Sequence, residues 1–462
     1  MRAKTATLLA AASTLITGLA MGQDNWSQFR GPDSAGVAQG AKLPRRWNAT
    51  ENVVWKTEIP GMGWSSPIVW NGRIIVTSAV GESEAAVPRT GLYIQNMRGR
   101  LGEGEFRFVV YCLDWQTGKI LWEKVAYQGR PQVPIHAKNS YATATPVADG
   151  EQVVACFGTA GLFCYGRDSN EIWAHRWEGF RMRSGWGPAS SPVIHEGRVY
   201  AVNDNETGSF LLALDKVTGK QIWTVARDEK SNWSSPIVWK NGLRTEIVTT
   251  GSNKVRSYDL DGRLLWELSG MSSIHIPTPV ATKELLYVSS GYVIDQFRPV
   301  YAIRPGAAGD ISLPGDQTSS KYVAFCLPLA GSYIPSPLVH GDYLYLLYDR
   351  GSLACHDAHT GKEIYGRQRL SPDRATFSTS PWACDGKVYC LSEDGETFVV
   401  QAGREFKILQ RNPLNEVTLA SPALARDNLV IRTFRSVYRI EAATLRSSTT
   451  FHQNDRPRSQ GQ

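Results

Sequence analysis

The chain has 462 residues, with 50 lysine and arginine side chains against 43 aspartate and glutamate side chains, a formal net charge of +7 at pH 7. This basic excess is too small to predict nucleic-acid binding. The seven cysteines are odd in number and none is adjacent to another, so we expect buried thiols and no disulfide framework.

The first residues predict export. Arg2 and Lys4 precede an apolar run from Ala6 to Leu19, and Ala20-Met21-Gly22 fits a signal-peptidase site. The run is too short for a membrane span, and no later segment reaches 18 apolar residues. No cysteine lies near the cleavage point. We therefore expect a signal peptide over residues 1–22 and an exported protein, periplasmic or secreted, without a lipid anchor.

After an extended segment at residues 23–50, one phrase recurs along the chain. WSSPIVW occurs at Trp64–Trp70 and again at Trp233–Trp239. Its core, a serine or threonine before proline and an apolar strand, occurs eight times: Ser66-Pro67, Thr145-Pro146, Ser191-Pro192, Ser235-Pro236, Thr278-Pro279, Ser336-Pro337, Ser380-Pro381 and Ser421-Pro422. Five of the seven intervals between these prolines are 41 to 46 residues, a spacing typical of propeller blades.

Each copy predicts four strands joined by turns, which is one blade of a β-propeller. Proline is tolerated at the first residue of a strand, where no ladder hydrogen bond needs its missing N–H. The fourth strands carry seven aromatic residues: Trp122, Trp173, Trp223, Trp266, Phe325, Tyr365 and Phe406. The strand at Glu51–Pro60, with Trp55, resembles the missing eighth. We expect this N-terminal strand to complete the last blade and close the ring.

The expected fold is thus all-β, an eight-bladed β-propeller of four-stranded antiparallel blades over residues 51–445. A disordered tail, poor in apolar residues, is expected at 446–462. Insertions at Gly81–Glu105 and Arg304–Ser320 account for the two long intervals. The first follows a second strand, and we expect it to overhang the central mouth. The protein is expected to be a monomer.

The third and fourth strands carry a phrase of the form LD-x-x-TGK-x-x-W, clearest at Asp114–Trp122 and Asp215–Trp223. It resembles the repeat of pyrroloquinoline-quinone (PQQ) propellers, which include quinoprotein alcohol dehydrogenases and BamB-type outer-membrane assembly lipoproteins, both eight-bladed. The resemblance covers about Glu51–Ala443. The segment Trp26–Trp47 further resembles exported propellers of planctomycete-type bacteria. The resemblance implies that Trp55 and the seven aromatic residues of the other fourth strands dock between blades.

Two functions remain open. A quinoprotein dehydrogenase requires PQQ, Ca²⁺ held by carboxylate and amide oxygens, and an aspartate base, but no such set of carboxylates is recognisable. The sequence also lacks G-x-S-x-G, H-E-x-x-H and C-x-x-C motifs, so we expect no catalytic residue and no metal site. We favour a BamB-like binding or scaffold protein without a cofactor, and keep a PQQ-dependent dehydrogenase as the alternative.

The segments before the eight Ser/Thr-Pro pairs should meet at one rim around the central axis. They carry the candidate ligand-binding residues Trp64, His136, Tyr141, Arg181, Arg183, Trp186, Trp233, His275 and Tyr333. Aromatic side chains mixed with arginine are typical of binding surfaces. The alternative is that the tryptophans only wedge neighbouring blades together. We expect a protein, peptide or glycan ligand at this mouth, and no nucleic acid.

Overall fold

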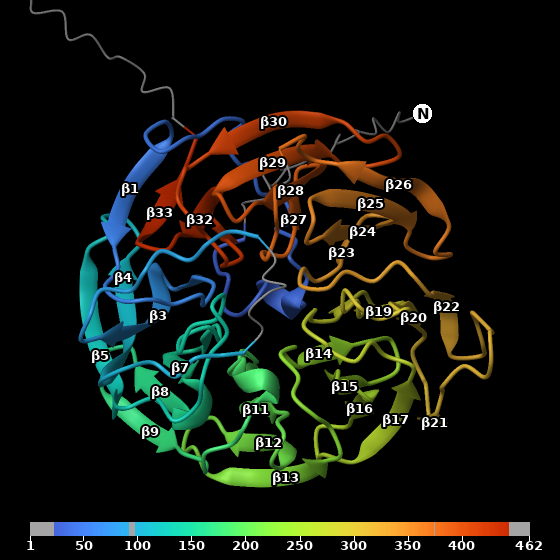
Figure 1. Ribbon diagram of the computed structural model, residues 1–462, viewed down its shortest axis with the longest axis horizontal. Helices are drawn as coiled ribbons and strands as arrows, with labels where there is room; N and C mark the ends of the chain where they lie inside the picture. Colours follow the sequence, from blue (N-terminus) through green and yellow to red (C-terminus); the bar gives the residue numbers. More distant parts are fainter. Residues whose placement is uncertain (1–22, 92–97, 374, 443–462) are drawn as a thin grey trace, which may run out of the picture.

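A computed structural model describes residues 23–91, 98–373 and 375–442. The expected signal peptide (1–22) and tail (446–462) lie outside these residues. Within them, the strands form eight sheets arranged as blades around a central axis (Figure 1), each with four antiparallel strands, and one short parallel strand is added to the fourth. This confirms the eight-bladed propeller.

The first four blades follow one another in chain order. The first consists of β2 (Ile68–Trp70), β3 (Arg73–Gly81), β4 (Phe106–Asp114) and β5 (Ile120–Gly129). The second consists of β6 (Val147–Asp149), β7 (Gln152–Cys156), β8 (Leu162–Gly166) and β9 (Glu171–His175). The third consists of β10 (Val193–His195), β11 (Arg198–Asn203), β12 (Ser209–Asp215) and β13 (Gln221–Arg227). The fourth consists of β14 (Ile237–Lys240), β15 (Thr245–Thr249), β16 (Lys254–Tyr258) and β17 (Leu264–Ser269).

The remaining blades complete the circle. The fifth consists of β18 (Val280–Ala281), β19 (Leu286–Ser289), β20 (Val300–Ile303) and β22 (Val323–Leu327). The sixth consists of β23 (Leu338–His340), β24 (Tyr343–Tyr348), β25 (Ser352–Asp357) and β26 (Glu363–Arg369). The seventh consists of β27 (Trp382–Cys384), β28 (Lys387–Leu391), β29 (Glu396–Gln401) and β30 (Ile408–Pro413). The eighth consists of β31 (Ala423–Ala425), β32 (Asn428–Arg432), β33 (Ser436–Ile440) and β1 (Val53–Glu58). Three short 3₁₀ helices are η1 (Pro32–Ser34), η2 (Gly158–Ala160) and η3 (Arg183–Gly185).

The N-terminal strand closes the ring, as expected. β1 pairs antiparallel with β33, so that Val53 lies opposite Ile440 and Glu58 opposite Ser436. In Figure 1, β1 lies on the circumference beside β33, where the other blades have their own fourth strands. The eighth blade thus has four strands like the others, although they come from the two ends of the described chain.

Aromatic residues of the fourth strands join neighbouring blades. Each of four such residues covers the glycine of a turn in the next blade, in the pairs Trp55 with Gly118, Trp173 with Gly219, Trp223 with Gly262 and Phe325 with Gly361. A Cβ atom on these glycines would lie 2.5 to 3.0 Å from the ring, closer than carbon atoms pack. The indole N–H of Trp173 also donates to the Lys216 carbonyl in the next blade. The tryptophan and the TGK glycine are therefore repeated together because they pack against each other.

The other blades depart from this arrangement. Phe406 precedes β30 and packs 5.7 Å from Tyr365 of the sixth blade, between ring centroids. The prediction that Phe406 lies in a fourth strand is therefore wrong. Gln410, opposite Val399, holds the position that the aromatic residue has in other blades. Trp266 is fully buried because the insertion of the fifth blade covers it: β21 (Gly309–Asp310) pairs with β17.

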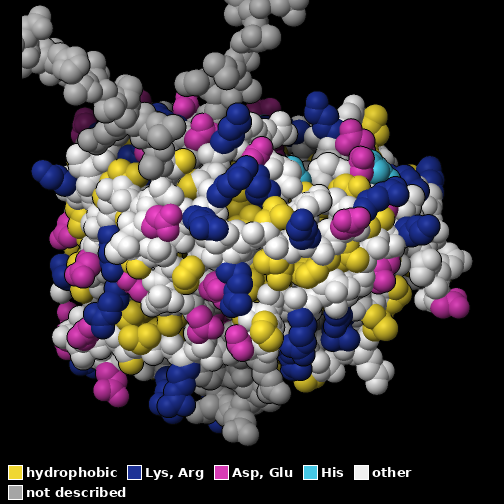
Figure 2. Space-filling model, turned by 90° about the horizontal axis from the view of Figure 1, so that it is seen from above, with side chains coloured by type: hydrophobic (Ala, Val, Ile, Leu, Met, Phe, Trp, Pro, Cys, Tyr) yellow, Lys and Arg dark blue, Asp and Glu magenta, His cyan; other side chains and the backbone are white. Residues whose placement is uncertain are grey.

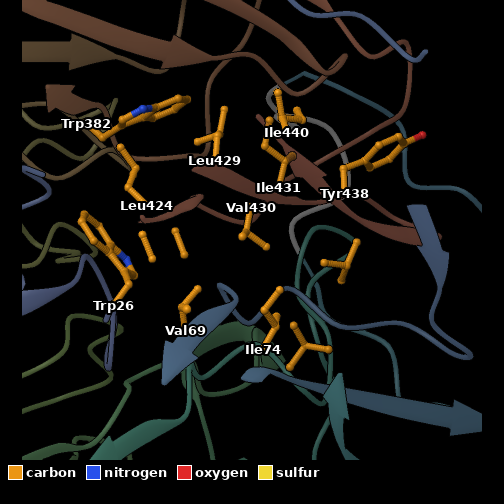
Figure 3. Close-up of a cluster of buried hydrophobic side chains, with 14 of the residues drawn as sticks. Trp26, Val69, Ile74, Trp382, Leu424, Leu429, Val430, Ile431, Tyr438 and Ile440 are labelled. Atoms are coloured by element: carbon orange, nitrogen blue, oxygen red, sulfur yellow. The ribbon is translucent and has the colours of Figure 1, made fainter. Parts of the chain in front are cut away.

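The N-terminal segment crosses the centre of the ring (Figure 1). Trp26 forms an isolated bridge with Val69 of β2, and Val37 forms one with Ala383 of β27. Trp26 and Trp47 are 1% exposed and belong to the hydrophobic core of the first, seventh and eighth blades. Figure 3 shows Trp26 in this core together with side chains such as Val69 and Leu424. The segment that we expected to be merely extended is thus an integral part of the fold.

Two faces of the ring differ in the loops that they carry. We call the rim face the one with the segments that precede each first strand and the loops between second and third strands. The hairpin face carries the other turns, such as Glu196-Gly197. The insertion at Gly81–Glu105 lies on the rim face, where the Gly91 N–H donates to Glu393 in the seventh blade. Its described residues thus reach across the mouth, as expected.

The circumference of the ring carries hydrophobic, basic and acidic side chains next to one another. In Figure 2, hydrophobic side chains form small groups between basic and acidic ones. Among the described residues, no helix has the length and apolar character needed to cross a bilayer. All seven cysteines are buried free thiols, as the sequence predicts.

Candidate functional site

A cavity of about 340 Å³ lies on the axis of the ring and opens toward the rim face. Its lining includes aromatic residues of the rim segments, all eight Ser/Thr residues that precede proline, and Phe29 of the N-terminal segment. The N-terminal segment forms bridges with β2 and β27, and it also accepts hydrogen bonds from Asn71 and Arg426 in turns of the hairpin face. It therefore lies across the hairpin end of the axis. The cavity is therefore a blind pocket with Phe29 at its floor.

The eight hydroxyl residues form a ring around the axis. In seven of the eight steps, the backbone N–H of one residue donates to the hydroxyl oxygen of its counterpart in the next blade, over 2.9 to 3.2 Å. The series runs Ser66, Thr145, Ser191, Ser235, Thr278, Ser336, Ser380 and Ser421. The hydroxyl of a serine or threonine supplies this acceptor close to the backbone. The phrase recurs eight times because each copy bonds the next blade around the axis.

Aromatic side chains form the wall above this ring. Trp186 and Trp233 pack with 5.6 Å between their ring centroids, and Tyr333 packs 5.3 Å from Tyr292. Trp64 packs 6.1 Å from Phe434. The three tryptophans are 4 to 8% exposed, so each one both wedges the blades and presents one surface to the cavity. A role in ligand binding and a role in wedging neighbouring blades together are therefore compatible for these tryptophans.

One ion pair lies at the edge of the cavity. Lys138 lines it and bonds to Glu393, which also accepts hydrogen bonds from Thr376 and Ser378. Lys138 donates in addition to the Gly91 carbonyl, over 3.1 Å. These bonds of Lys138 and Glu393 join the second and seventh blades to the Gly81–Glu105 insertion. The charge of Lys138 is thereby compensated.

A second cation lies below the floor. Arg30 is 3% exposed and donates to four carbonyl oxygens, those of Ser34, Ala35, Pro337 and Pro381. Pro337 and Pro381 directly follow Ser336 and Ser380 of the hydroxyl ring. Burial without a charged partner lowers the pKa of Arg30 to about 9.

The structure brings together five of the nine expected rim residues. Trp64, His136, Trp186, Trp233 and Tyr333 line the cavity. Burial, with a smaller effect from Lys138, lowers the pKa of His136. Burial also raises the pKa of Tyr333. The central mouth is therefore where the sequence places it, although the cavity is deeper and more enclosed than a rim.

The other four expected residues lie outside the cavity lining. The Tyr141 hydroxyl accepts from the Gly102 N–H and donates to the Val133 carbonyl, so this side chain anchors the insertion. Arg181 and Arg183 are exposed on the rim face. His275 is fully buried behind the wall, 3.1 Å from the Thr250 hydroxyl, and burial lowers its pKa to about 3. It is therefore neutral at physiological pH.

Sequence reasoning did not identify Phe29, Arg30, Lys138 or the hydroxyl ring as parts of the site. The sequence signal for the ring is the serine or threonine before each of the eight prolines, but that residue by itself indicates only the start of a strand. Phe29 and Arg30 carry no such signal, since nothing local shows that their segment crosses the axis.

The cavity does not fit PQQ with Ca²⁺, the cofactor that the resemblance implies. Among the described residues, no aspartate or glutamate lines the cavity, and no group of three or more His, Cys, Asp or Glu side chains could hold a metal ion. Ca²⁺ prefers carboxylate and carbonyl oxygens, and a quinoprotein base is an aspartate. The described lining therefore offers no carboxylate for either role.

Comparisons with known proteins agree with the fold. The family described as "Outer membrane protein assembly factor BamB" matches residues 164–309, less than half of the chain. The crystal structure of BamB from Moraxella catarrhalis is similar, with 12% identity and a TM-score of 0.54 over 84% of this chain and 98% of that one. No curated protein sequence matches the chain.

Two enzymes are similar to the same degree. Quinohemoprotein alcohol dehydrogenase ADHIIG from Pseudomonas putida HK5 has 12% identity and a TM-score of 0.55, over 95% of this chain and 82% of that one. The quinohemoprotein alcohol dehydrogenase from Comamonas testosteroni has 12% identity and a TM-score of 0.50, over 91% and 81%. At these identities the likeness shows the fold alone. The chain is an eight-bladed β-propeller, similar in fold to BamB and to quinoprotein alcohol dehydrogenases, and its residues 164–309 match the BamB family model.

Proposed function

We propose that this protein is an exported binding or scaffold protein, BamB-like and without chemistry of its own, which holds its ligand in the central cavity. The observation that supports this most is the blind cavity, with aromatic walls from several blades and no carboxylate in its described lining. Ligand sites are typically concave and apolar with a few convergent polar groups. The part of a ligand that enters is a small molecule or the end of a chain, because the cavity is closed by Phe29.

Filling the cavity tests this proposal. Ala189 lines it between Trp186 and Ser191, so Ala189→Trp places an indole where the ligand would lie. We expect the wild-type protein to bind members of a panel of small aromatic acids and amides, detected by tryptophan fluorescence and calorimetry. Ala189→Trp should weaken this binding at least about tenfold, a loss of roughly 1.4 kcal/mol.

Ala308→Trp is the matched control, because Ala308 is exposed in the insertion of the fifth blade. It adds the same indole far from the cavity lining and should leave binding unchanged. Melting temperatures of both variants show whether the fold is intact. Binding that is as tight in Ala189→Trp as in the wild type would show that the ligand lies elsewhere and would overturn the proposed function.

A further inference from the structure

The hydroxyl ring at the base of the cavity has unused donors. Each ring oxygen from Thr145 to Ser421 accepts a backbone N–H. A hydroxyl that accepts one hydrogen bond can still donate its own proton. Among the residues that the structure describes, none of the eight hydroxyls donates to a protein acceptor. Several O–H groups therefore converge on the axis without an acceptor.

Ser66 shows this most clearly. The residue is 2% exposed, and it lines the cavity. Its backbone N–H donates to Thr145, but within the described parts of the chain its hydroxyl takes part in no hydrogen bond. A carboxylate in the cavity would accept a hydrogen bond from this hydroxyl in place of water.

The described charged side chains next to the hydroxyl ring leave one positive charge, that of Arg30, without an acidic partner. Arg30 lies against Pro337 and Pro381, one residue from the ring, and bonds only to neutral carbonyl oxygens. Lys138 is balanced by Glu393, and no carboxylate is found in the described lining. In a buried environment of low dielectric, the field of an uncompensated guanidinium extends over several ångströms. It favours negative charge at the ring.

We infer that the hydroxyl ring above Arg30 is a subsite for a carboxylate group carried by a small organic molecule. The carboxylate accepts hydrogen bonds from ring hydroxyls such as Ser66, and the apolar body of the molecule packs against Trp186, Trp233 and Tyr333. The inference rests on the proposed function and specifies its ligand class: an acid, and neither a cation nor a neutral glycan.

Pairs of matched ligands test the inference. Benzoate and benzamide have nearly the same shape, and only the first carries a negative charge. We expect the wild-type protein to bind benzoate at least about tenfold more tightly than benzamide, because hydrogen bonds to a charged acceptor are stronger than those to a neutral one. Phenylacetate with phenylacetamide gives a second pair. A short peptide ending in phenylalanine, with a free or amidated C-terminus, shows whether a chain end can supply the same carboxylate.

Two variants assign the preference to the ring and to Arg30. Ser66→Ala removes one ring hydroxyl without removing a hydrogen bond found in the described structure. It should weaken benzoate binding about three- to tenfold and weaken benzamide binding less, because a hydrogen bond to a neutral amide oxygen is weaker than one to a carboxylate. Arg30→Met should bring the two affinities close together, while Arg30→Lys, which keeps the charge, should retain part of the preference. Ser66→Ala keeps the test decisive if Arg30→Met does not fold.

The outcomes separate this inference from the proposed function. Equal affinity for acid and amide, or a preference that neither Ser66→Ala nor Arg30→Met reduces, overturns the carboxylate subsite while leaving the cavity as a binding site. Failure of every acid to bind also overturns it. Binding that Ala189→Trp does not affect contradicts the proposed function itself.

Discussion

Replacing the closing strand Val53–Glu58 with a glycine-serine linker of equal length is expected to abolish the stable monomer. The change leaves the N-terminal segment in place but removes the pairing of β1 with β33 and the packing of Trp55 on Gly118. The free edge of β33 would then be open to pairing with other chains. The change also removes the apolar surface that half-buried Trp55 covers between the blades, which adds to the loss of stability. Size-exclusion chromatography and thermal unfolding measure the result.

Restoring the missing strand at the other end of the chain distinguishes loss of ring closure from general damage to the fold. Because Val53 lies opposite Ile440, residues 51–59 can be attached after Ala442 through an Asn-Gly turn, which favours a two-residue hairpin. The linker variant with this C-terminal strand should recover a monomer that unfolds cooperatively. If the linker variant without the added strand stays monomeric with an unchanged melting temperature, the ring is not held by β1.

The second large effect is expected at a turn glycine. Gly219 has φ of +69° and lies under Trp173, where an added Cβ would be 2.5 Å from ring atom Cδ2. Gly219→Ala should lower the free energy of unfolding by about 2–5 kcal/mol, combining the strain of a left-handed residue, about 1–2 kcal/mol, with overpacking, about 1–3 kcal/mol. Chemical denaturation measures the change.

Gly197 is the matched control. It has φ of +73° in the turn between β10 and β11, and an added Cβ would meet no atom within 4 Å. Gly197→Ala should therefore cost only the backbone strain. In a Trp173→Ala background the cost of Gly219→Ala should fall to the same value, which a double-mutant cycle reports as coupling. Equal costs for Gly219→Ala and Gly197→Ala in the wild type would contradict the packing of tryptophan on glycine between blades.

The fold was largely predictable because its signals are local and repeated. The Ser/Thr-Pro pair, the four-strand spacing and the fourth-strand aromatic recur in nearly every blade, and the spare strand at Val53–Glu58 matched the one missing place. The error at Phe406 has a physical cause. The turn before β30 is one residue longer than the TGK turns, because the Gln401 N–H donates to the Lys407 carbonyl where Asp114 donates to Lys119. The longer turn places Gln410 opposite Val399. Composition alone does not reveal this difference.

The site was less predictable than the fold. How deeply a side chain is buried, and whether it points into the cavity, depend on how the eight blades pack. The sequence located Trp186 and Trp233 at the mouth, but it could not show that His275 is buried behind the wall or that Arg183 is exposed outside it. Arg30 is the clearest case. Its position below the cavity depends on bonds to Pro337 and Pro381, more than 300 residues away along the chain, which no local pattern encodes.

A crystallographic screen with small acids and amides tests the central claim most directly, because it locates every bound molecule. The account predicts bound molecules in the central cavity between Phe29 and Trp186, with carboxylates directed toward the ring that includes Ser66. Molecules bound only at the hairpin face or on the circumference, with an empty cavity in the same crystals, would contradict it.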